Sequence, residues 1–403
     1  MAGLAYPAAG APFRMCPIRT HGVNFMHHST RSALIMTTLL PFIVAGCARL
    51  PVNGTLFPGV AVTRLASIEH GSPVAWNGAG TEIAFCDNGI RVISIPQGKT
   101  ERIAAGTAVT LAWSPDATRL AAAFVDGARS RIVLMDRTGT AVGATRIEGH
   151  IGKLLWRNGH ELLITATTLR SYRFGGNVTL RLYRWNGTGD PQESTLADTT
   201  LKRSTVPFLR RTDRVDADME LSPLGDEIAF ARIIDPPMYP PYERIVLRHL
   251  DTGAEREIAT LPLTSAIPVF TPDGEQLLAD DGTTNGRLLD TSGDAEAAEP
   301  SSATAPLALS PAGSRFSRGR LTLHGRGSVT FPPESRGYFS PTGTDLALVW
   351  HDVLYLVSGL PQDKATPLPA AVRSRLLFLR RLRSERLITD RDYLHQKERL
   401  LQP

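Results

Sequence analysis

The residue types that most often carry catalysis or bind metals are scattered along this chain and form no local motif. The sequence lacks a Gly-x-Ser-x-Gly elbow, a His-Glu-x-x-His or Cys-x-x-Cys motif, an EF-hand loop and a glycine-rich phosphate loop. Asp280-Asp281-Gly282 and His351-Asp352 contain metal-ligating side chains, but turn chemistry and the start of a strand explain them better. The sequence therefore predicts no catalytic residue, no metal site and no cofactor.

Cys47 is the residue whose neighbours predict a covalent modification. Arg31 is followed by a mainly apolar run over residues 32–43, which has the length of a signal-peptide core and is short for a membrane span. The run leads to Val-Ala-Gly-Cys ending at Cys47, where small residues suit a protease groove and the cysteine offers a thiol. This ending resembles the lipobox of bacterial lipoproteins. The resemblance implies cleavage before Cys47 and transfer of a diacylglycerol to its sulfur, followed by acylation that anchors the chain in a membrane.

We expect residues 1–46 to be a signal sequence and residues 47–58 to be a lipidated tether. A signal beginning at Met1 would be unusually long, so Met26 is the expected start. Ala48 follows the cysteine where an aspartate would retain an enterobacterial lipoprotein in the inner membrane. The resemblance thus implies a chain that faces the periplasm from the bacterial outer membrane. With Cys16 removed, Cys86 is the one remaining thiol, so we expect it to be buried, inert and outside any internal disulfide.

The net charge of +5 is unevenly distributed. Residues 1–46 contain three arginines and no acidic residue, and residues 371–403 contain nine basic and four acidic residues. The intervening part of the chain therefore has a net charge of about −3. This gives no reason to expect nucleic-acid binding.

A strand–turn–strand unit recurs along the chain. Each unit has an apolar anchor, a turn rich in Ser, Pro, Asp, Asn and Gly, and a second apolar strand, and several units continue with a third and a polar fourth strand. Four short strands in about 40 residues are typical of a propeller blade. The seven anchors are Trp76, Trp113, Trp156, Leu221, Phe270, Leu309 and Phe339.

These hairpins resemble the repeats of TolB-like β-propellers over residues 76–358. The resemblance implies an all-β propeller of six to seven four-stranded blades over residues 59–360. An all-β sandwich array is the alternative. Residues 60–65 are expected to close the ring by pairing with residues 353–357. We expect no counterpart of the α/β domain that precedes the propeller in TolB proteins.

Blade four contains the loop Asp-Pro-Pro-Met-Tyr-Pro-Pro-Tyr-Glu over residues 235–243. The prolines stiffen this loop towards polyproline II, and rigid aromatic side chains make good protein contacts. Met238, Tyr239 and Tyr242 are thus the candidate partner-contact residues. A loop that merely packs against the neighbouring blade is an equal alternative. The 65-residue interval between Trp156 and Leu221 predicts an insertion beside it, with a strand over residues 178–185 and a polar end at residues 210–214.

The C-terminal residues change character after a linker at residues 361–371. Apolar residues recur at helical spacing over residues 372–382, and Thr389 is a plausible N-cap for a following helix. The pattern resembles a SHOCT-type short C-terminal domain, although Arg391 interrupts the acidic pair of that family's centre. The resemblance implies a helical hairpin over residues 372–403 that self-associates or binds a partner. A basic amphipathic helix on anionic lipid is the alternative.

These observations favour a binding module over an enzyme. The leading interpretation is a lipid-anchored envelope β-propeller that acts as a protein–protein interaction scaffold for unidentified envelope proteins. One alternative is a lactonase-like or glycan lyase-like enzyme, or a ligand-binding protein, that uses the central funnel. Its ligands would come from separate blades without a local motif. A purely structural envelope component is a third interpretation.

Overall fold

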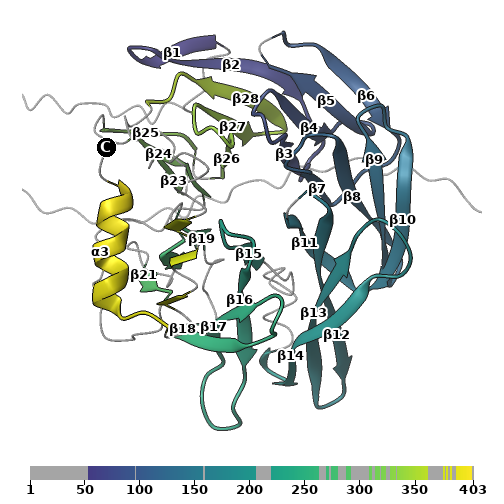
Figure 1. Ribbon diagram of the computed structural model, residues 1–403. Coiled ribbons are helices and arrows are strands. Elements are labelled where there is room, and N and C mark those ends of the chain that lie inside the picture. Colours follow the sequence, from purple (N-terminus) through teal and green to yellow (C-terminus); the bar gives the residue numbers. More distant parts are fainter. Residues whose placement is uncertain are drawn as a thin grey trace, which may run out of the picture. The chain divides into compact units, whose positions relative to one another are not determined.

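A computed structural model of the protein describes residues 53–361, with its larger gaps at 206–218, 263–268, 280–286 and 292–307, and most of residues 375–401. The described residues form seven β-sheets in a propeller ring, followed by helical C-terminal residues (Figure 1). Six sheets have at least four strands, and the seventh has three among the described residues. The all-β propeller predicted from the repeats is confirmed.

The blades follow one another along the chain, and each is an antiparallel meander whose strands pair in sequence order. Blade one is β3 (Val74–Trp76), β4 (Glu82–Cys86), β5 (Ile90–Ser94) and β6 (Thr100–Ala104); blade two is β7 (Thr110–Trp113), β8 (Arg119–Asp126), β9 (Arg129–Asp136) and β10 (Ala141–Glu148); blade three is β11 (His150–Arg157), β12 (Glu161–Tyr172), β13 (Gly175–Trp185) and β14 (Gln192–Lys202); blade four is β15 (Met219–Leu221), β16 (Glu227–Ile234), β17 (Tyr242–His249) and β18 (Glu255–Pro262); blade five is β19 (Val269–Phe270), β20 (Gln276–Ala279) and β21 (Arg287–Asp290); blade six is β22 (Ala308–Leu309), β23 (Arg315–Ser317), β24 (Arg320–Leu323) and β25 (Gly327–Thr330); blade seven is β26 (Arg336–Phe339), β27 (Asp345–Trp350) and β28 (Val353–Ser358), joined by β2 (Val60–Ser67) and β1 (Asn53–Phe57).

The first strand of each blade is the innermost strand. Strand β3 contacts β7, β7 contacts β11, β11 contacts β15 and β15 contacts β19, while β22 contacts β26 and β26 contacts β3 (Figure 1). All seven predicted anchors lie at or next to the end of such a strand. The repeat read from the sequence therefore marks the inner wall of the ring.

The Ser-Pro-x-Gly turns have a specific hydrogen-bond pattern. In blade two, the Arg119 backbone N–H donates to Ser114 Oγ over 2.9 Å, and Ala117 N–H donates to the Ser114 carbonyl. Ala117 has φ +58°, where most equivalent turns place a glycine because a left-handed backbone favours it. The serine thus ties the end of the first strand to the start of the second, which explains its recurrence.

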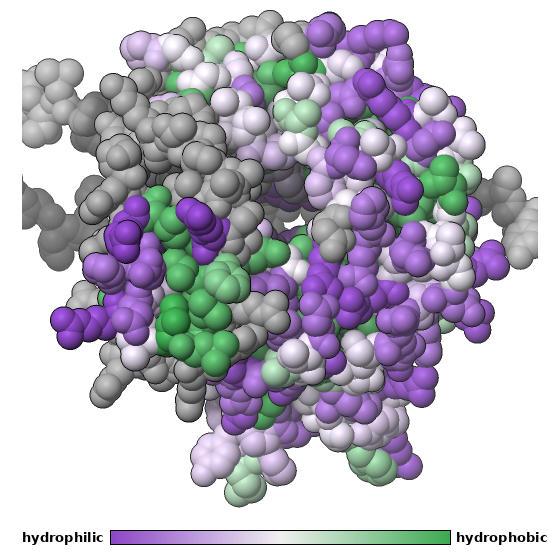
Figure 2. All heavy atoms as spheres, in the orientation of Figure 1, coloured by the Kyte–Doolittle hydropathy of each residue, from purple (hydrophilic) through white to green (hydrophobic). Residues whose placement is uncertain are grey.

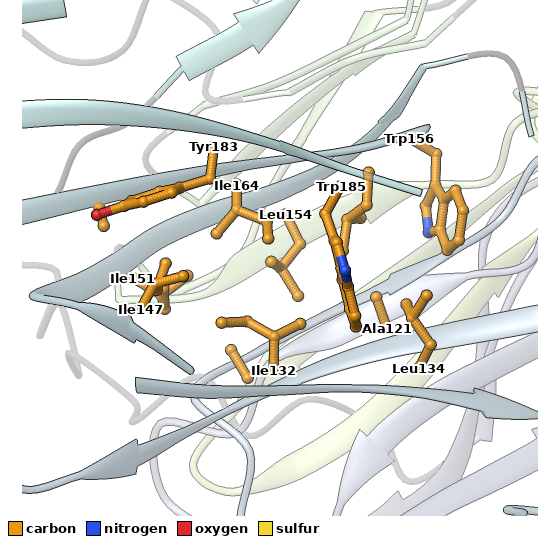
Figure 3. Packing of buried hydrophobic residues seen from close by; sticks show 13 residues of the cluster. Ala121, Ile132, Leu134, Ile147, Ile151, Leu154, Trp156, Ile164, Tyr183 and Trp185 are labelled. Carbon is orange, nitrogen blue, oxygen red and sulfur yellow. The ribbon is translucent and has the colours of Figure 1, made fainter. Parts of the chain in front are cut away.

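Apolar side chains fill the space between neighbouring blades. Figure 3 shows Ile132 and Leu134 of blade two facing Leu154, Ile164 and other residues of blade three in one cluster. Full burial of each such side chain contributes about 1.5–3 kcal/mol. The core is therefore distributed around the ring as inter-blade layers.

Two of the tryptophan anchors also form hydrogen bonds between blades. Trp156 Nε1 donates to the Ala112 carbonyl of blade two over 3.0 Å, and Trp76 Nε1 donates to the Tyr338 carbonyl of blade seven over 2.8 Å. Both acceptors directly precede the anchor of the adjacent blade. The buried Trp113 Nε1 has no hydrogen-bond partner in the described part of the chain.

The ring closes as the sequence predicts. Strand β2 pairs antiparallel with β28, with Val62 opposite Val357, and β1 adds a fifth strand outside β2. Both ends of the propeller sequence therefore share blade seven, and β28 has no open edge.

Blade three accounts for the long interval after Trp156. Its strands β12, β13 and β14 have 12, 11 and 11 residues, and the strand predicted over residues 178–185 is part of β13. The described extra residues therefore lengthen a regular blade and form no separate insertion. The predicted polar end at residues 210–214 lies outside the described residues.

The helix α3 (Asp390–Leu401) begins where Thr389 caps it, as predicted. Asp392 N–H donates to Thr389 Oγ1, and Thr389 Oγ1 donates to Asp392 Oδ2 over 2.7 Å. The helix packs on blade five, because the buried Tyr393 donates from Oη to Glu275 Oε1 over 2.7 Å. The described residues between 375 and 383 are also helical. The helical hairpin over residues 372–403 stays a prediction.

Candidate protein-contact surface

The connections between second and third strands lie on one face of the ring, because every blade is a meander that starts from the centre. In blades one, two and seven they are short and carry no large aliphatic, Phe or Tyr side chain: Asp87–Gly89, Gly127–Ala128 and His351–Asp352. His351 and Asp352 both have positive φ, at +45° and +60°, as a two-residue hairpin turn requires. The turn therefore explains the presence of this pair.

Blade four differs, because its connection lies in residues 235–243, which we name the proline-rich loop. Met238 is 88% exposed and Tyr239 is 70% exposed at the tip. Tyr242 begins β17 at the base of the loop and is half-buried. The Arg244 guanidinium lies 5.7 Å from the centre of its ring and donates to its Oη over 3.3 Å. The structure thus places two of the three predicted contact residues together at the tip and uses Tyr242 in packing.

Lys202, at the end of β14, holds the proline-rich loop in place. Its ammonium forms an ion pair with the buried Asp235 carboxylate at 3.0 Å. The same Nζ donates to the Pro236 carbonyl over 3.0 Å and to the Tyr239 carbonyl over 2.7 Å, and the Lys202 backbone N–H donates to Asp235 Oδ2. The loop backbone therefore rests on blade three while its tip side chains face solvent. The packing against the neighbouring blade is thus observed for the loop backbone, whereas partner contact through the tip stays a prediction.

Blade three carries a second apolar tip at the same face. The β12–β13 connection is Arg173–Phe174, in which Phe174 is 75% exposed and the preceding Tyr172 is 54% exposed. We name residues 172–174 the hairpin tip. Figure 2 shows two projections at the lower edge of the molecule where apolar residues reach the surface, at the places of these two connections in Figure 1. The sequence signal for the hairpin tip was an aromatic–arginine–aromatic run before two glycines, which sequence reasoning treated as part of an insertion.

An ionic cluster joins the opposite ends of blades three and four. Arg157 binds both oxygens of Asp251 in blade four, at 2.8 and 2.7 Å, and Arg184 binds Glu161 at 2.8 Å. The bidentate hydrogen bond with Arg157 holds the pKa of Asp251 below its ordinary value, and Asp251 raises the pKa of Arg157. This cluster fixes the two blades that carry the apolar tips relative to each other.

The predicted reactive residues are placed as follows. The Cys86 thiol is buried, its Sγ lies 3.7 Å from the Ala108 carbonyl, and burial raises its pKa. Cys47, Asp280 and Asp281 lie outside the described residues. The described residues contain no group of three or more His, Cys, Asp or Glu side chains that could hold a metal ion. None of the helices in this part of the chain is both long enough and apolar enough to span a bilayer.

Comparisons with known proteins found solved structures of low similarity to this chain. No protein-family profile and no curated protein matches the chain. Among solved structures, TolB from Acinetobacter baumannii is 15% identical with a TM-score of 0.38, covering 72% of this chain and 64% of that one. Kuenenia stuttgartiensis hydrazine synthase is 12% identical with a TM-score of 0.42, covering 72% and 84%. The Dos1 propeller is 9% identical with a TM-score of 0.42, covering 75% and 95%. The chain thus spans under two-thirds of that TolB, and its propeller assignment rests on its own sheet order.

Proposed function

We propose that the protein is a lipid-anchored scaffold of the bacterial cell envelope, facing the periplasm from the outer membrane, and that it binds a protein partner through Met238 and Tyr239. The observation that carries this proposal is the proline-rich loop, which exposes two large side chains on a backbone held by Lys202. A preorganised loop loses little conformational entropy on binding, and tyrosine supplies large contact area with two rotatable bonds. Anchoring is assigned to Cys47 on the sequence pattern alone.

Contact at this loop can be tested in cells with a photo-crosslinking amino acid. We expect a probe at Tyr239 to yield a discrete crosslinked protein in the membrane fraction. The matched control is a probe at Val142, which is 52% exposed on β10 of blade two, outside the proposed contact. Crosslinks that are absent at Tyr239, or equally abundant at Val142, would refute the contact.

Anchoring is tested separately with Cys47→Ser. If the lipobox is functional, wild-type protein stays with membranes through a high-salt wash and the variant is released, because acyl chains supply about 0.8 kcal/mol per buried methylene. Equal distribution of wild type and variant would remove the anchor from the proposal without affecting the loop.

Self-association through the C-terminal residues belongs to the same proposal. Tyr393 faces blade five, while Phe378, Leu387 and Leu394 are exposed. Sedimentation equilibrium of Phe378→Ser/Leu394→Ser against wild type tests it. We expect the variant to lose a wild-type oligomer, and a monomeric wild type would end this part of the proposal.

A further inference from the structure

The hairpin tip extends further than its counterpart in blade two. Strands β12 and β16 both start directly after the inner turn of their blade, as β8 does, but β12 has 12 residues where β8 and β16 have eight. The four additional residues lie at the tip end and lengthen the strand by about 13 Å at a rise of about 3.3 Å per residue. The β12–β13 hairpin therefore projects from this face of the ring (Figure 1) and carries the exposed Tyr172 and Phe174.

Positive charge accompanies the exposed rings of the hairpin tip. The Arg173 guanidinium lies 5.5 Å from the centre of the Phe174 ring. Lys202 pairs with Gly175 across β13 and β14, so the exposed Arg203 follows at the level of Phe174. Arg173 and Arg203 take part in no ion pair among the residues that the structure describes.

The nearby carboxylates are already engaged. Glu148 pairs with Arg170 at 2.9 Å, Asp235 pairs with Lys202, and Asp198 accepts hydrogen bonds from Asn177 and Thr179. Among the residues whose placement the structure gives, the hairpin tip therefore presents two aromatic rings and two guanidinium groups without an opposing free acid nearby.

This combination matches the chemistry of an anionic bilayer surface. Aromatic side chains partition into the headgroup region, and each nearby arginine gains about 1 kcal/mol from an anionic leaflet. The proline-rich loop differs, because its exposed residues include no free cation and its backbone is fixed by Lys202.

We propose that the hairpin tip, with Arg203, inserts into the headgroup region of an anionic membrane. This contact goes beyond the scaffold function and directs the face with Met238 and Tyr239 towards the bilayer, so the partner is bound next to the membrane surface.

The test uses the full chain with Cys16→Ser and Cys47→Ser, which removes the acylation site and leaves the buried Cys86 as the remaining native thiol. Phe174→Cys then provides one reactive position for an environment-sensitive fluorophore. Val125→Cys, on the β8–β9 hairpin of blade two at the same face, is the matched control, since Val125 is also exposed. Vesicles contain either phosphatidylcholine alone or phosphatidylcholine with about one-third phosphatidylglycerol.

We expect the label at position 174 to shift to the blue with the anionic vesicles and to be quenched by brominated acyl chains, while the label at position 125 is unchanged. Without labels, Tyr172→Ser/Phe174→Ser should lower the vesicle partition coefficient about tenfold. Arg173→Gln/Arg203→Gln should lower it to a similar extent at low salt and much less at high salt.

An unshifted label at position 174, or vesicle partitioning unchanged by Tyr172→Ser/Phe174→Ser, would overturn the membrane contact. A protein crosslinked from position 174 in cells, with no vesicle binding, would also overturn it and assign the hairpin tip to a protein partner. Failure of the crosslink at Tyr239 with a positive result at position 174 would instead remove the scaffold contact alone.

Discussion

Replacing Lys202 by methionine tests whether the proline-rich loop is preorganised. Methionine keeps the apolar stem but removes an ammonium that pairs with Asp235 and donates to two loop carbonyls. The Asp235 side chain is 0% exposed, so, within the described part of the chain, the variant leaves a buried carboxylate with the backbone N–H of residue 202 as its one donor. Breaking a fully buried pair costs about 3–5 kcal/mol. Because 31% of the Lys202 side chain is exposed and water can partly replace the ammonium, we expect about 2–3 kcal/mol here.

Urea unfolding of four proteins measures this coupling: wild type, Lys202→Met, Asp235→Asn and the double variant. We expect the double variant to be less destabilised than the sum of the single variants by about 2 kcal/mol, since the two residues act as a unit. Hydrogen exchange at Met238 and Tyr239 should accelerate in Lys202→Met, and the Tyr239 crosslink should become weaker. A loss below about 0.5 kcal/mol with unchanged exchange would refute the role given to Lys202, because surface substitutions without structural consequence fall in that range.

Three further predictions concern the ring itself. Arg157→Ala should lower the free energy of unfolding in urea by about 2 kcal/mol, because it breaks the bidentate contact between blades three and four. Arg146→Ala, which removes an exposed ion pair, should lower it by under about 1 kcal/mol. Equal losses in the two variants would contradict the role of the cluster. Trp156→Phe should destabilise by about 1 kcal/mol more than Trp113→Phe, since it alone removes an inter-blade hydrogen bond, and a larger loss at Trp113 would contradict this. Burial, followed by the neighbouring Glu193 carboxylate, raises the pKa of Tyr183 to about 12, so the folded chain keeps a proton that the unfolded chain loses near pH 10. The free energy of unfolding should be independent of this group below pH 10 and fall between about pH 10 and 12. The fall should be smaller in Tyr183→Phe. A spectrophotometric titration in which that tyrosine deprotonates near pH 10 would contradict the assignment.

The parts of the fold that could be predicted are those encoded by local chemistry. The serine turns recur because Ser114 and its equivalents bond to residues only five positions away, so each hairpin carries its own signal. The pairing of β2 with β28 followed from the need to close a ring without a free edge, and Thr389 was recognisable as a helix cap from its neighbours.

The parts that could not be predicted depend on contacts between distant residues. Lys202 and Tyr239 meet because two blades lie side by side, and nothing near either residue indicates the other. The contact of Tyr393 with Glu275 is similar, and it turns what looked like a free C-terminal helix into one that packs on blade five. The hairpin tip was not predicted for another reason, since the sequence of β12 and β13 resembles an insertion and their regular pairing is a property of the folded blade.

The composition of blade seven also determines when this protein can finish folding. Strand β2 is among the first propeller segments to be synthesised, and its partner β28 is nearly the last, so joining Val62 to Val357 closes a loop of almost the whole ring. Such distant pairing is entropically costly and slow. Until it forms, β2 remains an unprotected strand that can pair with other chains. A chain truncated before β28 would therefore have two defects. It would lack β28 itself, and β2 would keep a permanently unpaired edge that is available for aggregation.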